Sequence, residues 1–144
     1  MQVHQILKSK ADAGVLTIAP EASVADAAAE LSARKIGSLV VSSDGQTALG
    51  ILSERDIVRE VGKRGAGCLQ EAVSDMMTSN LVTCGANETA DAILKTMTDG
   101  RFRHMPVVED GQMIGLITIG DVVKARLSEL AMEKDALEGM IMGH

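Results

Sequence analysis

A seven-residue motif that carries a hydroxyl and a carboxylate occurs twice in the chain. The first copy spans residues 50–56 (GILSERD) and the second spans residues 115–121 (GLITIGD). Each copy has a glycine, two aliphatic residues, a small hydroxyl residue and, three positions later, an aspartate. A hydroxyl and a carboxylate at the junction of a strand and a helix suit a ribose and a phosphate. The repeated motif therefore points towards a nucleotide.

The same two motifs have a purely structural interpretation. Ser53 with Asp56, and Thr118 with Asp121, match the capping box, in which the hydroxyl and the acid satisfy free amides at a helix start. The glycine that opens each motif permits close approach of a backbone or a ligand. Because duplication copies a cap as faithfully as a binding site, the residues alone leave both interpretations open.

Basic residues supply a possible partner for phosphate. Arg101, Arg103 and His104 lie within four residues at the start of an expected strand, and Arg55 precedes Asp56. Arginine binds phosphate through its planar fork. Each charge-assisted hydrogen bond contributes roughly 1.5–3 kcal/mol, so a few would hold a mono- or diphosphate at micromolar concentration. The alternative is that these arginines are solvated surface charges.

Composition excludes several classes of partner. The formal charge is −6, from 14 basic and 20 acidic residues, and the only aromatic residue is Phe102. Such a chain has neither the basic surface nor the stacking platforms of a nucleic-acid-binding protein. We find no apolar run long enough for a membrane span and no signal peptide. Two isolated cysteines, Cys68 and Cys84, are typical of the reducing cytoplasm.

Catalysis and metal binding are the weakest hypotheses for this sequence. His4 and His144 lie at the two ends of the chain, far from His104, so we expect no metal site. The sequence also lacks a motif that joins a nucleophile to a base. We therefore expect a protein that is not an enzyme.

The two motifs belong to an internal repeat. A shift of 66 residues aligns the halves from Thr17/Thr83 to Gln46/Gln112, and a shift of 65 aligns the rest. Ser23 and Thr89 are expected N-caps, and an Asp-Gly pair between apolar runs predicts a hairpin in each copy. Each unit is therefore β-α-β-β-α, with expected strands and helices at 15–18, 23–34, 38–42 and 48–53, and at 81–84, 89–99, 105–108 and 113–118.

We predict an α/β (α+β) fold in which two pseudo-symmetric β-α-β-β-α repeats pack sheet to sheet, followed by a C-terminal helix. The expected boundaries are 1–66 for the first repeat with its N-terminal segment, 67–130 for the second repeat, and 131–144 for a helical tail. Residues 62–67 are expected to be a flexible linker, and residues 73–77 a short helix with a counterpart at 3–7.

The expected C-terminal helix begins near Asp121 and carries a narrow apolar stripe. Its positions alternate by four and three residues, with Lys134 in the place of one member. The stripe is compatible with a helix that covers the domain or with a helix-pairing seam in a dimer. The apolar members are Val123, Leu127, Leu130, Leu137 and Ile141.

The double unit, the two Gly-to-Asp motifs and the segments IGSLVV (36–41) and RHMPVV (103–108) together resemble a tandem pair of cystathionine-β-synthase-type (CBS) domains. The resemblance covers essentially residues 1–130. It implies two clefts between the sheets, often in a disc-shaped homodimer, and these clefts commonly bind adenosine nucleotides.

Applied to this chain, the resemblance implies two sites. Asp56 with Ser53, and Asp121 with Thr118, would contact ribose and phosphate. Residues near Thr17 and Ile18, and near Val82 and Thr83, would frame the adenine, and the RHMPVV segment adds Met105 and Pro106 to the expected nucleotide-binding residues. We expect Arg103 and His104 to bind phosphate in the Asp56 cleft, and Arg55 and Arg101 in the Asp121 cleft. Because Gly37-Ser38 in one repeat stands where the other has Arg103-His104, we expect unequal clefts.

The leading hypothesis is a regulatory module that senses an adenosine nucleotide and signals to an unidentified protein through a conformational or dimer-interface change. AMP or ADP is favoured over ATP because few cations line each cleft, and NAD(H) is the second choice. The rival hypothesis is a ligand-free dimerisation or scaffold protein in which both motifs act only as helix caps.

Overall fold

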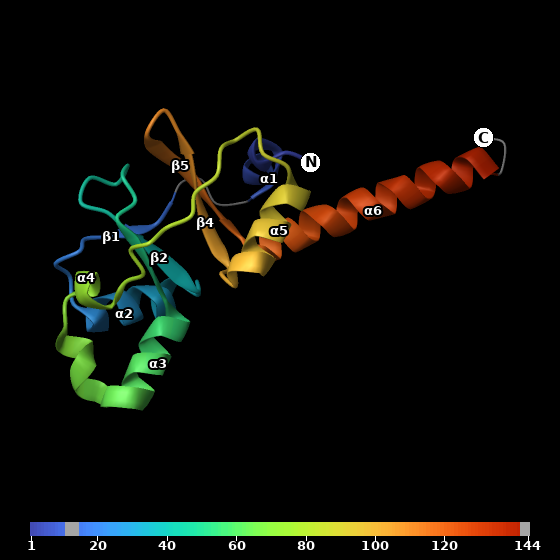
Figure 1. Ribbon diagram of the computed structural model, residues 1–144. Coiled ribbons are helices and arrows are strands. Elements are labelled where there is room, and N and C mark those ends of the chain that lie inside the picture. Colours follow the sequence, from blue (N-terminus) through green and yellow to red (C-terminus); the bar gives the residue numbers. More distant parts are fainter. Residues whose placement is uncertain (11–14, 142–144) are drawn as a thin grey trace.

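The computed structural model describes residues 1–10 and 15–141 and has a mixed α+β fold (Figure 1). Two repeats and a long C-terminal helix are present, as predicted. The first repeat has the order β-α-β-β-α, whereas the second lacks its expected first strand. The elements in chain order are α1 (Val3–Ser9), β1 (Thr17–Ile18), α2 (Val24–Arg34), β2 (Ser38–Val41), β3 (Gly50–Ser53), α3 (Glu54–Arg64), the 3₁₀ helix η1 (Ala66–Gln70), α4 (Val73–Met76), α5 (Ala90–Gly100), β4 (His104–Glu109), β5 (Gln112–Thr118) and α6 (Ile119–Ile141).

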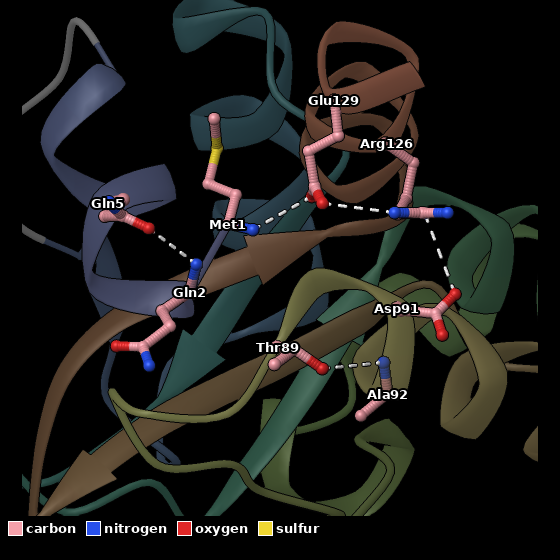
Figure 2. Close-up of polar contacts among 8 residues, drawn as sticks. All are labelled: Met1, Gln2, Gln5, Thr89, Asp91, Ala92, Arg126 and Glu129. Atoms are coloured by element: carbon pink, nitrogen blue, oxygen red, sulfur yellow. Dashed lines mark hydrogen bonds and ion pairs between the residues drawn. The ribbon is translucent and has the colours of Figure 1, made fainter. Parts of the chain in front are cut away.

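Equivalent caps begin and end the first long helix of each repeat. The hydroxyls of Ser23 and Thr89 accept hydrogen bonds from the amides three residues later, at 3.0 and 3.2 Å, and Figure 2 shows the Thr89 cap. Both helices end at a residue in the left-handed region, Lys35 (φ 55°) and Arg101 (φ 57°). These two residues are 66 positions apart, so the local backbone follows the sequence repeat.

The two sheets differ by one strand. In the first sheet, β1 pairs parallel to β2, which pairs antiparallel to β3. In the second sheet β4 pairs with β5, and the expected strand at 81–84 is reduced to a single bridge between Cys84 and Val107. The Val40 amide donates to the Leu16 carbonyl in the first sheet. The equivalent of Val40 is Pro106, which has no N–H to donate.

The two hairpins also differ. Asp110 (φ 52°) and Gly111 (φ 77°) form the tight turn predicted between β4 and β5. The equivalent loop between β2 and β3 is longer and is organised by the Asp44 carboxylate, which accepts hydrogen bonds from the amides of Gln46 and Thr47 at 2.8 Å each. The amides of Thr47 and Gln46 lower the pKa of Asp44 to about 2.

Each repeat receives the short helix that precedes the other repeat. Val3 and Ile6 of α1 are buried in the core of the second repeat, whereas Val73 and Met76 of α4 are buried in the core of the first. Backbone hydrogen bonds join the exchanged helices to the starts of α5 and α2. A cut between residues 66 and 67 would therefore remove one core helix from each repeat.

The sheets pack against each other about a pseudo-twofold axis, as expected. Val40 and Ile51 on the first sheet share a buried cluster with Met113 of the second. Gln46 and Gln112, which are equivalent in the repeat, contact each other through their side chains at 3.3 Å. Because equivalent residues meet only near a symmetry axis, this pair marks its position.

The predicted flexible linker at 62–67 is wrong, since this segment is ordered helix. Helix α3 continues to Arg64, Gly65 (φ 81°) ends it, and η1 follows. The Arg64 guanidinium forms ion pairs with Glu60 and Glu71, and Cys68 of η1 is buried. Gly65 therefore forms a tight connection between α3 and η1.

Within the described ranges, helix α6 contacts the body through its first turns. The N-terminal ammonium of Met1 lies 3.1 Å from Glu129, and Arg126 lies between Glu129 (3.1 Å) and Asp91 of α5 (3.7 Å; Figure 2). Beyond these contacts α6 extends away from the body (Figure 1). The expected boundary at 130/131 therefore falls within one continuous helix. Across the described ranges, no helix has the length and hydropathy required to span a membrane.

Candidate functional site

Both Gly-to-Asp motifs form complete capping boxes. The Asp56 amide donates to the Ser53 hydroxyl at 3.2 Å, and the Ser53 amide donates to Asp56 Oδ2 at 3.0 Å. Thr118 and Asp121 repeat this arrangement with the same distances. The capping interpretation is therefore correct for both copies. The caps still leave acceptor sites free on both aspartates, because an ionised carboxylate has about four such sites.

The first cleft lies between the repeats and contains the first motif. Its volume is about 730 Å³. The Asp56 side chain lies here with one oxygen in the cap, while its Oδ1 accepts a hydrogen bond from Arg59 at 3.1 Å. The cleft is lined by Gly37, Ile51, Ser53, Glu54, Arg55, Asp56, Arg59, Thr78, Asn80, Leu81, Val82, Gly100, Arg101, Phe102, Arg103, His104, Thr118 and Ile119.

Cations from both repeats gather in the first cleft. Arg103 and His104 lie in it, where they were expected. Arg55 and Arg101, which were expected beside Asp121, line this same cleft. Within residues 1–10 and 15–141, no ion pair involves Arg55, Arg101 or Arg103, and all three are exposed. In an acidic protein this is a local concentration of available positive charge.

The second cleft has a volume of about 670 Å³ and shares Gly37, His104 and Thr118 with the first. Thr118 of the second motif lines it, together with two basic residues from outside the second repeat, Lys10 and Arg34. The whole lining comprises Leu7, Lys10, Val15, Leu16, Arg34, Ile36, Gly37, Ser38, His104, Ile114, Gly115, Leu116 and Thr118.

The carboxylate of Asp121, beside the second cleft, is already paired with a lysine. Lys10 Nζ lies 2.9 Å from Asp121 Oδ2 and donates to the Leu116 carbonyl at 2.9 Å. Burial alone raises the pKa of Asp121, but the Thr118 amide and the Lys10 ammonium outweigh it and hold the pKa below its usual value. Asp121 is thus already engaged by a cation, in addition to its cap.

Replacing Lys10 with methionine is expected to make the protein less stable near neutral pH by about 1 kcal/mol or less. The low pKa of Asp121 stabilises the folded state above pH 3.8, and this contribution is lost as the pH falls through the lowered value. As the pH rises from 3 to 7, the variant should therefore gain less stability than the original protein gains. Urea unfolding across this range measures the difference. Lys8→Met, at an exposed position of α1, is the control, and equal pH profiles for the two variants would contradict the prediction.

Comparison with known proteins agrees with this architecture. The CBS domain family model matches residues 9–63 and 73–128. The chain belongs to the CBS domain family. It is a CBS pair, and the two matched segments correspond to the two repeats. Such a pair is a regulatory module.

Related proteins share nearly the whole length of this CBS pair. The mitochondrial CBS domain-containing protein CBSX3 of Arabidopsis thaliana is 34% identical over 148 residues, which cover 98% of this chain and 72% of the relative. The crystal structure of ATU1752 from Agrobacterium tumefaciens has 47% identity and a TM-score of 0.82, with 88% and 99% of the two chains covered. The CBS pair of protein MJ0100, crystallised with 5′-methylthioadenosine and S-adenosyl-L-methionine, has 23% identity, a TM-score of 0.76 and coverage of 90% and 98%, which shows a common fold.

His104 is the titratable residue that the two clefts of the CBS pair share. Burial lowers the pKa of its imidazole; Asp56 opposes this shift, Arg103 adds to it, and Asp121 opposes it. These surroundings therefore favour the neutral imidazole. An anion in either cleft would favour its protonated form.

Some predicted residues lie away from the clefts. Met105 and Pro106 are buried in β4, and Thr17 and Ile18 form β1. These four residues, Thr83 and Asp121 are not among the residues that line the two clefts. Val15 and Leu16, just before β1, line the second cleft instead.

Three basic residues of the clefts were missed by the sequence analysis. Arg59 lies one helical turn after Arg55, and that spacing could have revealed it. Arg34 and Lys10 enter the second cleft from distant parts of the sequence. No local sequence pattern predicts that either residue lies there.

Other chemistry has little support in this CBS pair. Within the described ranges, no group of three or more His, Cys, Asp or Glu residues is placed to hold a metal ion. Cys68 and Cys84 are free and buried. Burial raises the pKa of Cys84 to about 12, which makes it a poor nucleophile.

Proposed function

We propose that this CBS pair binds an adenosine nucleotide, AMP or ADP in preference to ATP or NAD(H), in the first cleft. One observation carries the proposal: Ser53 and Asp56 of one repeat line the same cleft as Arg101, Arg103 and His104 of the other. The hydroxyl and carboxylate match a ribose, and the cations match its phosphates. The volume of about 730 Å³ lies in the range of small-molecule sites.

The lining of the cleft suggests how the ligand lies. Ile51, Leu81 and Val82 form an apolar wall suited to an adenine. Asp56 has one oxygen in the cap and the other bonded to Arg59, and each oxygen retains a lone pair for a ribose hydroxyl. Arg55, Arg101 and Arg103, which form no ion pair within the described residues, are suited to phosphate. We assign the second cleft a weaker affinity because Lys10 already engages Asp121.

The regulatory output follows from contact with both repeats. A ligand that bridges the repeats favours the relative orientation in which both sets of contacts form. Such coupling is typically about 1–3 kcal/mol. We propose that the protein is a homodimer without enzymatic activity, and that an unidentified partner protein recognises the ligand-dependent orientation.

A ligand-free scaffold is the second candidate function. It is favoured by the complete capping boxes, which give Ser53, Asp56, Thr118 and Asp121 a structural role without a ligand. In that case no adenosine nucleotide would bind in either cleft.

We also propose a cytoplasmic location, which accords with the two free cysteines. The A. thaliana relative is named as mitochondrial. Cell fractionation with an antibody against the protein tests the location directly.

Calorimetric titration with AMP, ADP, ATP, NAD(H) and S-adenosylmethionine tests the proposed function. We expect saturable binding of AMP or ADP with about one strong site per chain. A ligand at 100 times its dissociation constant should stabilise the fold by roughly 2.7 kcal/mol, which a thermal-shift assay detects. If none of the adenosine compounds binds or raises the melting temperature, the scaffold function replaces the sensor.

A further inference from the structure

Helix α6 exposes a row of apolar side chains along most of its length. Their exposed fractions range from 40% to 84%, although Val122 and Ala125 on the same helix are buried against the body. The intervals alternate between four and three residues, the spacing of positions a and d in a coiled coil, and Lys134 fills the one polar place. We call this row the α6 seam: Val123, Leu127, Leu130, Lys134, Leu137 and Ile141.

The seam is accessible to a second helix. Helix α6 has 23 residues, which corresponds to about 34 Å. Its contacts with the rest of the chain come from its first turns, and the remainder extends away from the body (Figure 1). The apolar members of the seam are all exposed, so the seam offers an accessible face to a partner helix.

Charge disfavours a parallel pair of these helices. With Leu127 at position a, Lys134 is also at a and would face Lys134 of a second copy across the seam. Glu133 and Glu138 occupy the flanking positions g and e, which approach each other in a parallel pair. A parallel arrangement would therefore bring like charges together at the centre and on both flanks.

An antiparallel pair removes most of this conflict. Leu127 then lies opposite Leu137 of the second copy, Leu130 opposite its Lys134, and Val123 opposite its Ile141. The flanking pairs become Lys124 with Glu138, which are opposite in charge and occur twice. One like-charge pair remains, between the two copies of Glu133 at the symmetry axis.

We propose that α6 forms an antiparallel pair with α6 of a second copy of this chain, in the register that places Leu127 opposite Leu137. This deepens the homodimer of the proposed function by naming its contact and its direction. The nucleotide has no part in the contact. All tests are therefore made without nucleotide, and their failure is distinguishable from a failure of nucleotide binding.

Disulfide trapping tests the direction. The double variant Leu127→Cys/Leu137→Cys should oxidise to a covalent dimer in which residue 127 of one copy is linked to residue 137 of the other, as read by peptide mass spectrometry. Cys68 and Cys84 are retained because they are buried. Links of 127 to 127 and of 137 to 137, or no intermolecular link between these positions, would overturn the proposal.

Sedimentation of full-length variants tests the seam itself. Leu127→Glu should weaken dimerisation by about tenfold or more, because it places a charge opposite Leu137 of the second copy, in an apolar contact. Met132→Glu is the matched control, since Met132 is an exposed apolar residue of the same helix outside the seam. Lys134→Leu should lower the dissociation constant of the dimer by about tenfold. A variant that failed to fold could not give this result. Equal behaviour of the two glutamate variants, or no gain from Lys134→Leu, would refute the pairing.

Discussion

Replacing Asp56 with alanine is expected to weaken binding of AMP or ADP to the first cleft by about ten- to a hundredfold. The carboxylate is the group in this cleft that suits ribose hydroxyls, and hydrogen bonds to a charged group contribute roughly 1.5–3 kcal/mol. The Asp56 side chain is nearly buried and faces the cleft, so water replaces its contacts poorly. Calorimetric titration of the variant measures the change in dissociation constant.

Asp121→Ala is the matched control for this experiment. It removes the same kind of cap, with the same two hydrogen-bond distances, at the start of α6. Each substitution should cost about 0.5–2 kcal/mol of stability through the lost cap. Only Asp56→Ala should lose the strong site. If both variants bind with the affinity of the original protein, the acids are caps alone and the ribose assignment is wrong.

Replacing Gly50 with alanine is expected to destabilise the fold by about 1–3 kcal/mol. A Cβ atom at this position would lie 2.5 Å from Met77 Sδ and 2.9 Å from the Thr78 carbonyl oxygen. The Thr78 backbone has little freedom to move, because it exchanges two hydrogen bonds of 2.9 Å with Ile51. Urea unfolding followed by circular dichroism measures the loss.

Gly115→Ala, at the equivalent position of the second repeat, should cost less. The nearest atoms to its added Cβ are the side-chain carbons of Leu7, at 2.7 and 2.9 Å. A leucine side chain can rotate away from a clash, whereas a hydrogen-bonded backbone strand does not. A loss at Gly115 as large as that at Gly50 would show that Leu7 is as rigid as the Thr78 backbone.

Much of the fold was predictable because its determinants are local. The Ser23 and Thr89 caps depend on neighbours three residues away, and the turn at Asp110 and Gly111 depends on two residues. The repeat itself allowed each prediction to be made twice. The glycines at 62–67 predict a flexible linker, and this prediction is wrong. Gly62 and Gly67 lie within α3 and η1, and Arg64 at the end of α3 pairs with Glu71 just after η1.

The sequence by itself determined the two repeats, their helix caps, most of their strands and the pairing of each hydroxyl with its acid. All of these depend on hydrogen bonds or apolar periodicity within a few residues. The tertiary structure alone decided which cations face which acid: Arg55 and Arg101 join Asp56, while Lys10 reaches Asp121 across more than a hundred residues. It also decided the exchange of α1 and α4 between the cores. These contacts depend on how the two sheets pack about the pseudo-twofold axis, and no short-range pattern records that packing.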